Sequence, residues 1–399
     1  MGLKGEAAVV GFFELPAQRK PTGPGAFSME QYARIAGAAL ADAGLSASQV
    51  NGVITQGIQE ASSFVPSTVI EYLGLPANFA EVVDLGGANG AAMVWRAAAA
   101  IELGVCDVVL CVIPAGTVAP TSDRKPRLNA GAWGASSNNY GSPQAEFDIP
   151  YGNLGQNGPY GQIARLYGHT YGYDPRALAK ISVDQRVNAN HTPGAIFHDV
   201  PITIDDVLAS PMIADPLHML EIVMPISGGV GVIVASADVA RTAKHRPVWI
   251  KGFGERVAYK TPTYAADLLT SPMKHAADSA FAMAGIERTD IDMASIYDCY
   301  TITVLMSLED AGFCGQGKGI DFVNSHDLTF RGDFPLNTAG GQLGYGQPGG
   351  AGALHHIADA VRQIQGRSGA AQVADCNTAF VSGNGGIMSE QIALILQGN

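Results

Sequence analysis

The chain carries the same three sequence blocks, in the same order, in its first and second halves. The most informative block is a glycine cluster followed by an amphipathic helix, found at Gly86–Gly104 and again within Pro335–Gly366. Glycines at a helix start let backbone approach closely, and the N–H groups there can hold a negative oxygen. A lone cluster of this kind is usually a tight turn that packs a helix on a sheet. Its repetition favours a functional role.

The other two blocks extend the likeness on both sides of the glycine clusters. Ala38–Ile54 resembles Ala280–Ile296, and each predicts a helix ending in Ala-Gly, a polar turn and a strand. Cys106–Gly116 corresponds in the same way to Cys376–Gly386. Three blocks recurring once indicate a duplication into two α/β halves rather than a repeat array. We expect these halves over residues 1–240 and 247–399, with their glycine helices, Ala88–Leu103 and Gly349–Gln365, side by side at the centre.

Hydrophobic patterning predicts further elements within this frame. Helices are expected over Met29–Ala43, where Ser28 and Gln31 form a capping box, and over Val65–Leu73 and Pro175–Asn190. Buried or short strands are expected at Ala7–Phe13, Val50–Gln56, Glu81–Asp84, Asp107–Ile113 and Val230–Ala237. From about residue 115 to 161 the pattern fails, which predicts a long excursion serving as a lid, a pocket wall or a dimer contact.

Composition excludes several classes of function. The net charge is −12 and Lys and Arg form no block, so nucleic acid is not an expected partner. The five cysteines form no CxxC pair, which predicts neither a zinc finger nor a disulfide framework and fits a cytoplasmic protein. No apolar run reaches about 18 residues, so no membrane span is expected. His355 and His356 lie within a predicted helix and are interpreted as capping or packing residues rather than metal ligands.

Three motifs then resemble a known family over nearly the whole chain. They are YDCYTITVLMSLEDAGFCGQG at Tyr297–Gly317, PLNTAGGQLGYGQPGGAG at Pro335–Gly352 and GNGG at Gly383–Gly386. With the duplicated halves, they are similar to the sterol-carrier-protein-type branch of the thiolase superfamily. The resemblance implies an α/β thiolase fold in five αβαβα layers, a homodimer, and acyl-CoA thioesters as substrates. Coenzyme A would enter as part of the substrate, with no covalently bound cofactor.

The reactive positions of that family are all changed in this chain. Its Cys-x-x-Gly turn, its Gly-His-Pro, its second cysteine and its His-Asp-Cys-Phe correspond here to Gly87-Ala88-Asn89-Gly90, Gly346-Gln347-Pro348, Ser382 and Tyr297-Asp298-Cys299-Tyr300. Thiolysis needs a thiolate to carry the acyl group and a histidine to activate it. Cysteine-dependent thiolase activity is therefore not expected. Cys299 is interpreted as a small buried hydrophobe beside the pocket.

Thiolase-like aldolases of steroid side-chain catabolism resemble this chain at Tyr297, where they also carry tyrosine. That resemblance implies retro-aldol cleavage of a β-hydroxyacyl-CoA, with a small zinc-ribbon/OB-fold partner subunit. Tyr297 is the candidate acid/base, although a buried tyrosine satisfied by a backbone partner would look the same. The second tyrosine of those aldolases falls nearer Gln347, so Tyr345 either supplies that hydroxyl or packs on its loop.

The remaining candidate residues would hold the thioester or its enolate. Donors in the glycine turns can stabilise an enolate oxygen. We assign this role to Gly87, Asn89, Ser382 and Gly385, with Gln347 as a further donor. Two functions stay open: a C–C lyase, favoured by the retained glycine clusters and Tyr297, and a non-catalytic acyl-CoA or lipid-binding homologue, favoured by the lost reactive residues. A divergent acyltransferase is a third.

Overall fold

The structure, a computed structural model, describes residues 2–19, 27–58, 61, 63–115, 141–260 and 262–398. Much of the predicted excursion, residues 116–140, lies outside the described residues. The strands are β1 (Ala7–Glu14), β2 (Gly52–Thr55), β3 (Phe79–Val82), β4 (Val108–Ala115), β5 (Met212–Ala214), β6 (Leu217–His218), β7 (Gly228–Ser236), β8 (Val248–Val257), β9 (Met293–Ser295), β10 (Thr378–Gly385) and β11 (Glu390–Gln397).

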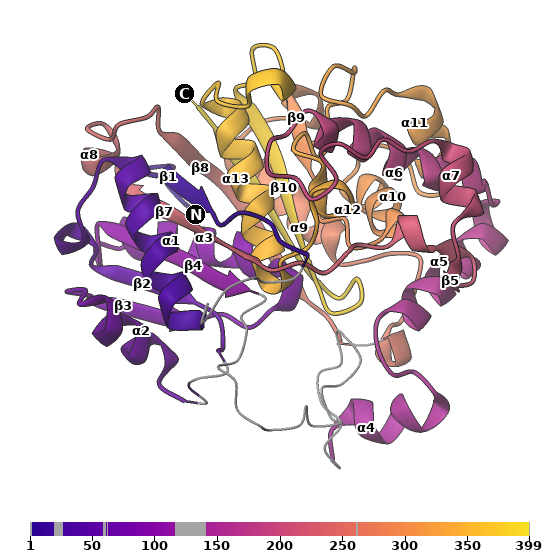
Figure 1. Ribbon diagram of the computed structural model, residues 1–399, viewed down its shortest axis with the longest axis horizontal. Coiled ribbons are helices and arrows are strands. Elements are labelled where there is room, and N and C mark those ends of the chain that lie inside the picture. Colours follow the sequence, from indigo (N-terminus) through magenta and orange to yellow (C-terminus); the bar gives the residue numbers. More distant parts are fainter. Residues whose placement is uncertain are drawn as a thin grey trace.

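The helices connect these strands, in places several helices in succession (Figure 1). They are α1 (Ser28–Ala43), α2 (Val65–Leu73), α3 (Asn89–Glu102), α4 (Pro143–Phe147), α5 (Asn157–Tyr171), α6 (Pro175–Asn190), α7 (Ile204–Ala209), α8 (Ala237–Ala240), α9 (Met273–Ala284), α10 (Thr301–Asp310), α11 (Gly319–Ser325), α12 (Gly341–Tyr345) and α13 (Gly352–Ile364). Short 3-10 turns η2 (Gly86–Ala88) and η7 (Gly349–Ala351) lead into α3 and α13.

Within the described residues, nine strands form one sheet in the order β3-β2-β4-β7-β1-β8-β11-β10-β9. The order is symmetric about the junction of β1 and β8: β1, β7, β4 and β2 match β8, β11, β10 and β9, and β3 has no counterpart. The halves meet where Ala8 and Val9 of β1 lie antiparallel to Trp249 and Val248 of β8. The duplication predicted from sequence is therefore visible as a pseudo-two-fold relation between the halves.

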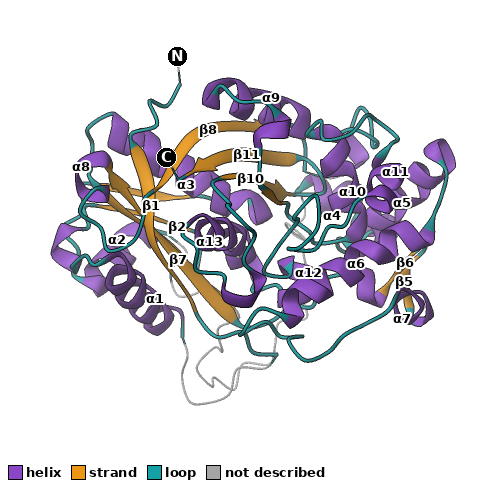
Figure 2. Ribbon diagram, turned by 90° about the horizontal axis from the view of Figure 1, so that it is seen from above, coloured by secondary structure: helices purple, strands orange, loops and turns teal. Residues whose placement is uncertain are grey.

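The two halves of this sheet lie on either side of two central helices, and further helices cover their outer faces. This gives the five αβαβα layers that the family resemblance implied. Helices α3 and α13 contact each other and strands of both halves, so they form the central layer (Figure 2). Helices α1 and α2 cover the outer face of the first half, and α9 covers that of the second. The expectation that the two glycine helices lie side by side at the centre is confirmed.

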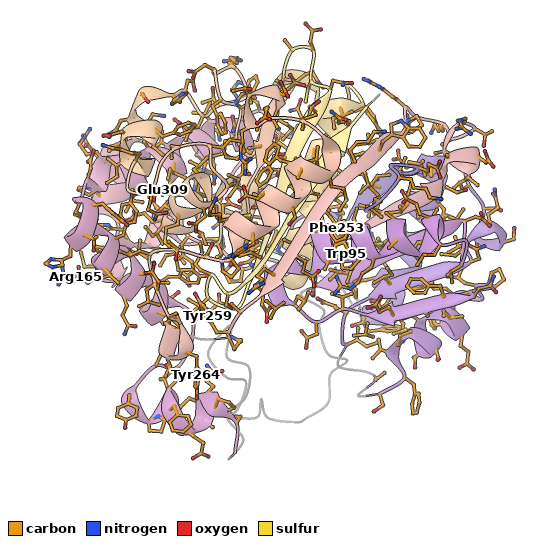
Figure 3. All side chains as sticks on the ribbon, turned by 180° about the vertical axis from the view of Figure 1, so that it is seen from behind. Trp95, Arg165, Phe253, Tyr259, Tyr264 and Glu309 are labelled. Atoms are coloured by element: carbon orange, nitrogen blue, oxygen red, sulfur yellow. The ribbon has the colours of Figure 1, made fainter. Side chains whose placement is uncertain are left out.

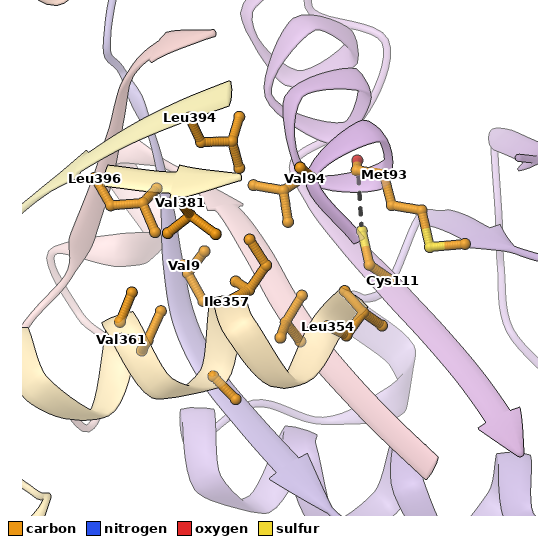
Figure 4. Close-up of a cluster of buried hydrophobic side chains, with 14 of the residues drawn as sticks. Val9, Met93, Val94, Cys111, Leu354, Ile357, Val361, Val381, Leu394 and Leu396 are labelled. Atoms are coloured by element: carbon orange, nitrogen blue, oxygen red, sulfur yellow. Dashed lines mark hydrogen bonds between the residues drawn. The ribbon is translucent and has the colours of Figure 1, made fainter. Parts of the chain in front are cut away.

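The central layer is held by apolar side chains from both halves (Figure 4). Leu354, Ile357 and Val361 on one face of α13 are buried among residues of β10, β11, β1 and α3. Each buried aliphatic side chain contributes roughly 1.5–3 kcal/mol relative to an exposed one. In the same layer, Trp95 of α3 stacks on Phe253 of β8 with ring centroids 4.3 Å apart (Figure 3).

In both halves, a glycine in a strand lets the outer helix pack closely on the sheet. An ideal Cβ on Gly252 of β8 would lie 2.1 Å from the carbonyl oxygen of Ala280 in α9. On Gly11 of β1 it would lie 2.7 Å from Cβ of Ala43 in α1. Only glycine permits these contacts, so the backbone approach was duplicated with the elements themselves.

Some predicted elements are confirmed and others are corrected. Helix α6 has the predicted bounds, and so does α2. The capping box at Ser28 is wrong, because Ser28 is already helical and Phe27 is the N-cap without a side-chain cap. Gln31 instead accepts a hydrogen bond from the backbone N–H of Ala115 at 3.1 Å, which ties α1 to the end of β4.

Residues after the predicted excursion pack on the opposite half of the molecule. Helices α5 and α6 lie against α10, and α6 also contacts α11 and α12, forming a helical lobe (Figures 1 and 2). The Tyr167 hydroxyl of α5 donates to Glu309 of α10. Helices α5 and α6 of the first half therefore pack against helices of the second half. In the part of the chain that the structure describes, no helix is long and apolar enough to cross a membrane.

Candidate active site

The two glycine turns meet at the N-terminal ends of the central helices. Gly86 of η2 and Gly349 of η7 are equivalent positions, with φ of 55° and 51°, a left-handed conformation that favours glycine. An ideal Cβ on Gly90 would lie 2.4 Å from the carbonyl carbon of Ala353, so α3 and α13 touch through their first turns. This close approach places both turns on one cavity.

The cavity has a volume of about 520 Å³ and draws its walls from both halves. Of the residues predicted from sequence, it brings together Gly87, Asn89, Tyr297 and Gln347. Its lining also includes Gln56, Tyr160, Cys299, Gly350 and Asn384. A volume of this size accommodates a small-molecule ligand.

Tyr297 follows β9 and is only 4% exposed. Its backbone N–H donates to Oγ of Ser382 at 3.0 Å, and its hydroxyl oxygen accepts from Nε2 of Gln347 at 2.9 Å. Burial, reinforced by Cys299 and Asp298, raises the pKa of the Tyr297 phenol well above its usual value. The side chain is therefore a neutral phenol, and the Gln347 bond leaves the hydroxyl's own hydrogen to point at another acceptor.

The ring of Tyr297 fills the space beside the first glycine turn. An ideal Cβ on Gly87 would lie 2.2 Å from Cζ and 2.3 Å from Oη of Tyr297. The same Cβ would lie 2.4 Å from the carbonyl oxygen of Asn384. These distances leave no room for any side chain at position 87 while Tyr297 stands where it does.

Asn384 and Tyr160 are site residues that sequence reasoning missed. Nδ2 of Asn384 donates to the Tyr160 hydroxyl at 3.0 Å, and its Oδ1 accepts from Gln391 at 2.8 Å. The Tyr160 ring stacks on Tyr300 with centroids 4.1 Å apart. Asn384 lies within the GNGG motif, which could have identified it. Tyr160 lies in the segment where patterning failed and gave no such signal.

Cys299 lies in the same wall as a neutral thiol. Its sulfur is 3.7 Å from Nδ2 of Asn384 and from the Thr303 hydroxyl. Burial raises the pKa of the thiol to about 12, so it carries no thiolate near neutral pH. This agrees with its interpretation as a small buried residue beside the pocket.

Charged side chains at the cavity also escaped prediction. Asp84, Lys260 and Glu390 are part of the lining. Burial lowers the pKa of Lys260, although the nearby Glu390 opposes this shift. Burial raises the pKa of Glu390, although Lys260 opposes that shift. The two groups come from distant segments, so local sequence could not pair them.

Three predicted residues do not line the cavity. Ser382 faces the backbone of Tyr297 and so positions it. Gly385 packs against η2, where an ideal Cβ would lie 2.0 Å from the carbonyl oxygen of Leu85. The Tyr345 ring instead packs on His355, with centroids 4.1 Å apart, and lines other cavities, which matches the packing alternative for this residue.

Asn89 lines the cavity, but both ends of its amide are engaged. Its Oδ1 accepts from the Leu85 backbone at 2.6 Å, and its Nδ2 donates to Gln56 Oε1 at 3.3 Å. It therefore fixes the turn. The two histidines sit in polar packing: His355 pairs with Glu14 at 2.5 Å, and His356 lies 3.2 Å from Asp298. No group of side chains that could hold a metal ion is found among the described residues.

Comparisons with known proteins extend over the whole chain. Residues 254–398 match the family described as Thiolase C-terminal domain-like. A steroid side-chain-cleaving aldolase of Thermomonospora curvata is 31% identical over 365 residues, 90% of each chain. A 17-hydroxy-3-oxo-4-pregnene-20-carboxyl-CoA lyase of Mycobacterium tuberculosis is 31% identical over 376 residues, 92% of this chain and 93% of that protein. The solved Ltp2-ChsH2(DUF35) aldolase superposes with a TM-score of 0.86 at 29% identity, covering 99% of this chain and 98% of that one.

Proposed function

This chain belongs to the thiolase superfamily, among its thiolase-like aldolases, and we propose that it cleaves a β-hydroxyacyl-CoA by a retro-aldol reaction without a covalent acyl-enzyme. The observation that carries the proposal is the Tyr297 hydroxyl, which occupies the side-chain space of residue 87 and is held by Gln347. The site thus offers a positioned proton carrier where a thiolase would offer a nucleophile.

The reaction balances with a proton carrier and an enolate site. The proton leaves the β-hydroxyl group, the carbonyl double bond forms at Cβ, and the Cα–Cβ bond breaks. Its electron pair becomes the enolate of the shorter acyl-CoA, which a proton on Cα then neutralises. Tyr297 is a neutral phenol for most of the time, so the reaction runs through its small phenolate fraction, which takes the hydroxyl proton and, once protonated, returns it to Cα. One residue then moves one proton between two atoms of the substrate.

The enolate oxygen needs hydrogen-bond donors that are already in place. The first residues of a helical turn have N–H groups without intrahelical partners. Gly87 and Gly350 are such residues, and both line the cavity. We assign their N–H groups to the thioester oxygen, because fixed donors at a developing charge are a large source of rate enhancement. Gln347 then orients the phenol, and Ser382 holds the backbone of Tyr297.

The direct test is cleavage by the purified protein. A β-hydroxyacyl-CoA with a tertiary hydroxyl group is incubated with it, and the shorter acyl-CoA and the released carbonyl compound are both quantified. Equimolar appearance of the two products supports the lyase. Tight binding of the thioester without either product, also in the presence of a partner subunit, would favour the non-catalytic acyl-CoA-binding alternative.

A partner subunit and a homodimer are part of the proposal. The solved Ltp2-ChsH2(DUF35) aldolase is named for two components, of which ChsH2(DUF35) is the second. For this chain we propose a small zinc-ribbon/OB-fold partner, so the assay is run with and without such a protein. Strand β3 is one of the two edge strands of the sheet, and no described strand pairs with its free edge. We propose that this edge joins two copies of the chain.

A further inference from the structure

Tyr160 of α5 brings a second phenol to the candidate active site, in addition to Tyr297. Both side chains line the same cavity, and Tyr160 is 1% exposed. Burial, reinforced by Cys299, raises the pKa of both phenols well above the ordinary value. The Tyr160 side chain is therefore a neutral phenol near neutral pH, with one hydrogen to donate.

The ring of Tyr160 is held in place by a second tyrosine. It stacks on Tyr300 with centroids 4.1 Å apart. The Tyr300 hydroxyl donates to Oδ1 of Asn157 at 2.6 Å, and Asn157 lies one turn before Tyr160 in α5. The Tyr160 hydroxyl is therefore carried by a fixed ring, which loses little conformational freedom when a ligand binds.

Asn384 of β10 determines how the Tyr160 hydroxyl is used. Its Nδ2 donates to the Tyr160 oxygen at 3.0 Å. The orientation of this amide is set by Gln391, the residue opposite it on β11, whose Nε2 donates to Oδ1 of Asn384 at 2.8 Å. The oxygen of Tyr160 thus accepts a hydrogen bond from Asn384, and its own hydrogen points elsewhere.

The acceptors that the surrounding described residues offer to this hydrogen are weak. The carbonyl oxygen of Gly386 lies 3.5 Å from the Tyr160 oxygen, at the outer limit of a hydrogen bond. The other acceptor is the sulfur of Cys299, and a thiol sulfur accepts hydrogen bonds weakly. An oxygen atom of a ligand in the cavity would be a better acceptor than either.

Asn384 also connects Tyr160 to the first glycine turn. An ideal Cβ on Gly87 would lie 2.3 Å from the Tyr297 hydroxyl oxygen and 2.4 Å from the backbone carbonyl oxygen of Asn384. The residue that holds the Tyr160 hydroxyl therefore borders the place where the Tyr297 hydroxyl lies. A substrate oxygen that reaches Tyr297 enters the neighbourhood of both phenols.

We infer that the Tyr160 hydroxyl donates a hydrogen bond to the oxygen on Cβ of the substrate. The inference rests on the proposed function, in which the glycine turns hold the thioester oxygen and Tyr297 removes the proton of the β-hydroxyl group. As that proton leaves, the oxygen on Cβ gains negative charge, which a fixed donor stabilises. Tyr160 keeps its own proton throughout, so the balance of the proposed reaction is unchanged.

The binding test compares 3-oxohexanoyl-CoA with hexanoyl-CoA, which differ in the oxygen on Cβ and carry no β-hydroxyl group to be cleaved. Calorimetry gives the Kd of each. The parent protein should bind the 3-oxo ester more tightly, and Tyr160→Phe should reduce this preference about fivefold or more, the effect of one neutral hydrogen bond. The control Tyr300→Phe should keep the preference, because its ring still stacks on Tyr160 and its hydroxyl bonds Asn157.

Asn384→Asp tests the direction of the hydrogen bond. An ionised carboxylate accepts where the amide donates, so the Tyr160 hydroxyl would turn its hydrogen towards the new oxygen. Gln391 keeps an acceptor for its amide. The preference for the 3-oxo ester should therefore fall as it does in Tyr160→Phe, although both tyrosines are present. An undiminished preference in either variant would overturn the inference.

Turnover separates the role of Tyr160 from that of Tyr297. With a β-hydroxyacyl-CoA, Tyr160→Phe should lower kcat/KM about tenfold or more, because one fixed donor is lost. The rise of the rate with pH should keep its slope, and a flattened profile would make Tyr160 the base and overturn its role as a donor. If no ester is cleaved, a 3-oxo preference that depends on Tyr160 still supports the oxygen site, and the lyase alone fails. Cleavage combined with an unchanged preference in Tyr160→Phe overturns the oxygen site and leaves the lyase standing.

Discussion

The hydroxyl oxygen of Tyr297 lies 2.3 Å from the position that a Cβ on Gly87 would occupy. A nucleophilic cysteine in this turn and a tyrosine in this place are therefore mutually exclusive. The absence of the cysteine is a requirement of the site as built, and restoring it means displacing the ring.

Gly87→Cys should give no thiolysis of 3-ketoacyl-CoA and should abolish lyase activity. The new side chain displaces Tyr297, while Gln347 cannot activate a thiol and Ser382 cannot act as a second one. Overpacking of this kind typically costs about 1–3 kcal/mol, to be measured by denaturant unfolding. Gly37→Cys serves as the control. Efficient thiolysis by Gly87→Cys would mean that the reactive turn lies elsewhere.

Tyr297→Phe should lower the lyase rate by about 10²–10⁴-fold, the usual effect of losing a positioned acid/base. The ring still fills the space beside Gly87, so the Kd of a non-cleavable acyl-CoA should change little. Tyr345→Phe is the matched control and should keep its rate, because Tyr345 packs on His355 outside the cavity. Unchanged turnover by Tyr297→Phe would remove this residue from the mechanism.

The lyase rate should rise with pH through the neutral range. Burial raises the pKa of Tyr297 above its ordinary value, so only a small fraction is phenolate at pH 7, and that fraction grows about tenfold per pH unit. A profile of kcat/KM between pH 6 and 9.5 should climb without a plateau. A plateau already at pH 7 would identify a different base.

Acid stability should depend on Glu14. Burial raises the pKa of this carboxyl, but Arg362 and His355 outweigh it and bring the value from 4.5 down to about 2. A lowered pKa contributes stability above pH 4.5 that is lost as pH falls towards 2, on the order of 3 kcal/mol. Glu14→Gln should be less stable at pH 7 and should lose less stability between pH 5 and 3. Parallel stability–pH curves for the two proteins would contradict this.

The protein should sediment as a dimer at micromolar concentration. Phe64 and Tyr72 are 83% and 50% exposed near the β3 edge, and an obligate interface there would bury more than about 2,000 Å² in total. Val82→Pro in β3 should shift the protein towards monomer, because proline removes a backbone donor. A monomer in the parent protein would exclude pairing through β3.

The sequence predicted the structural features that repeat along the chain or show a regular hydrophobic period. The duplication predicted the halves and the central helices, and helical periodicity gave α2 and α6 their bounds. It failed where a side chain acts over a long distance: Gln31 looked like a capping residue, yet it bonds Ala115, far along the chain. The division of the chain at residues 240–247 stays a prediction.

The candidate site divides in the same way. Gly87, Tyr297 and Gln347 were identified because they stand at motif positions. Tyr345 was a candidate because it is close to Gln347 in sequence, but α12 ends at Tyr345, and Gly346, with φ of 105°, turns the chain between them. Lys260 and Glu390 are brought to the cavity by tertiary structure alone, and no local pattern marks them.

The pseudo-two-fold relation between the halves has an evolutionary consequence at the cavity. Gly87 and Gly350 are equivalent positions of the two turns, so duplication placed two equivalent glycine turns at one cavity. The space beside Gly87 is taken by Tyr297, and that beside Gly350 by Gln56, whose Oε1 lies 2.2 Å from an ideal Cβ there. The side chain beside each of these two glycines could therefore change independently of the other. In this way an ancestral site with two identical turns would acquire two different sides, one for proton transfer and one for substrate binding, without any change in the backbone.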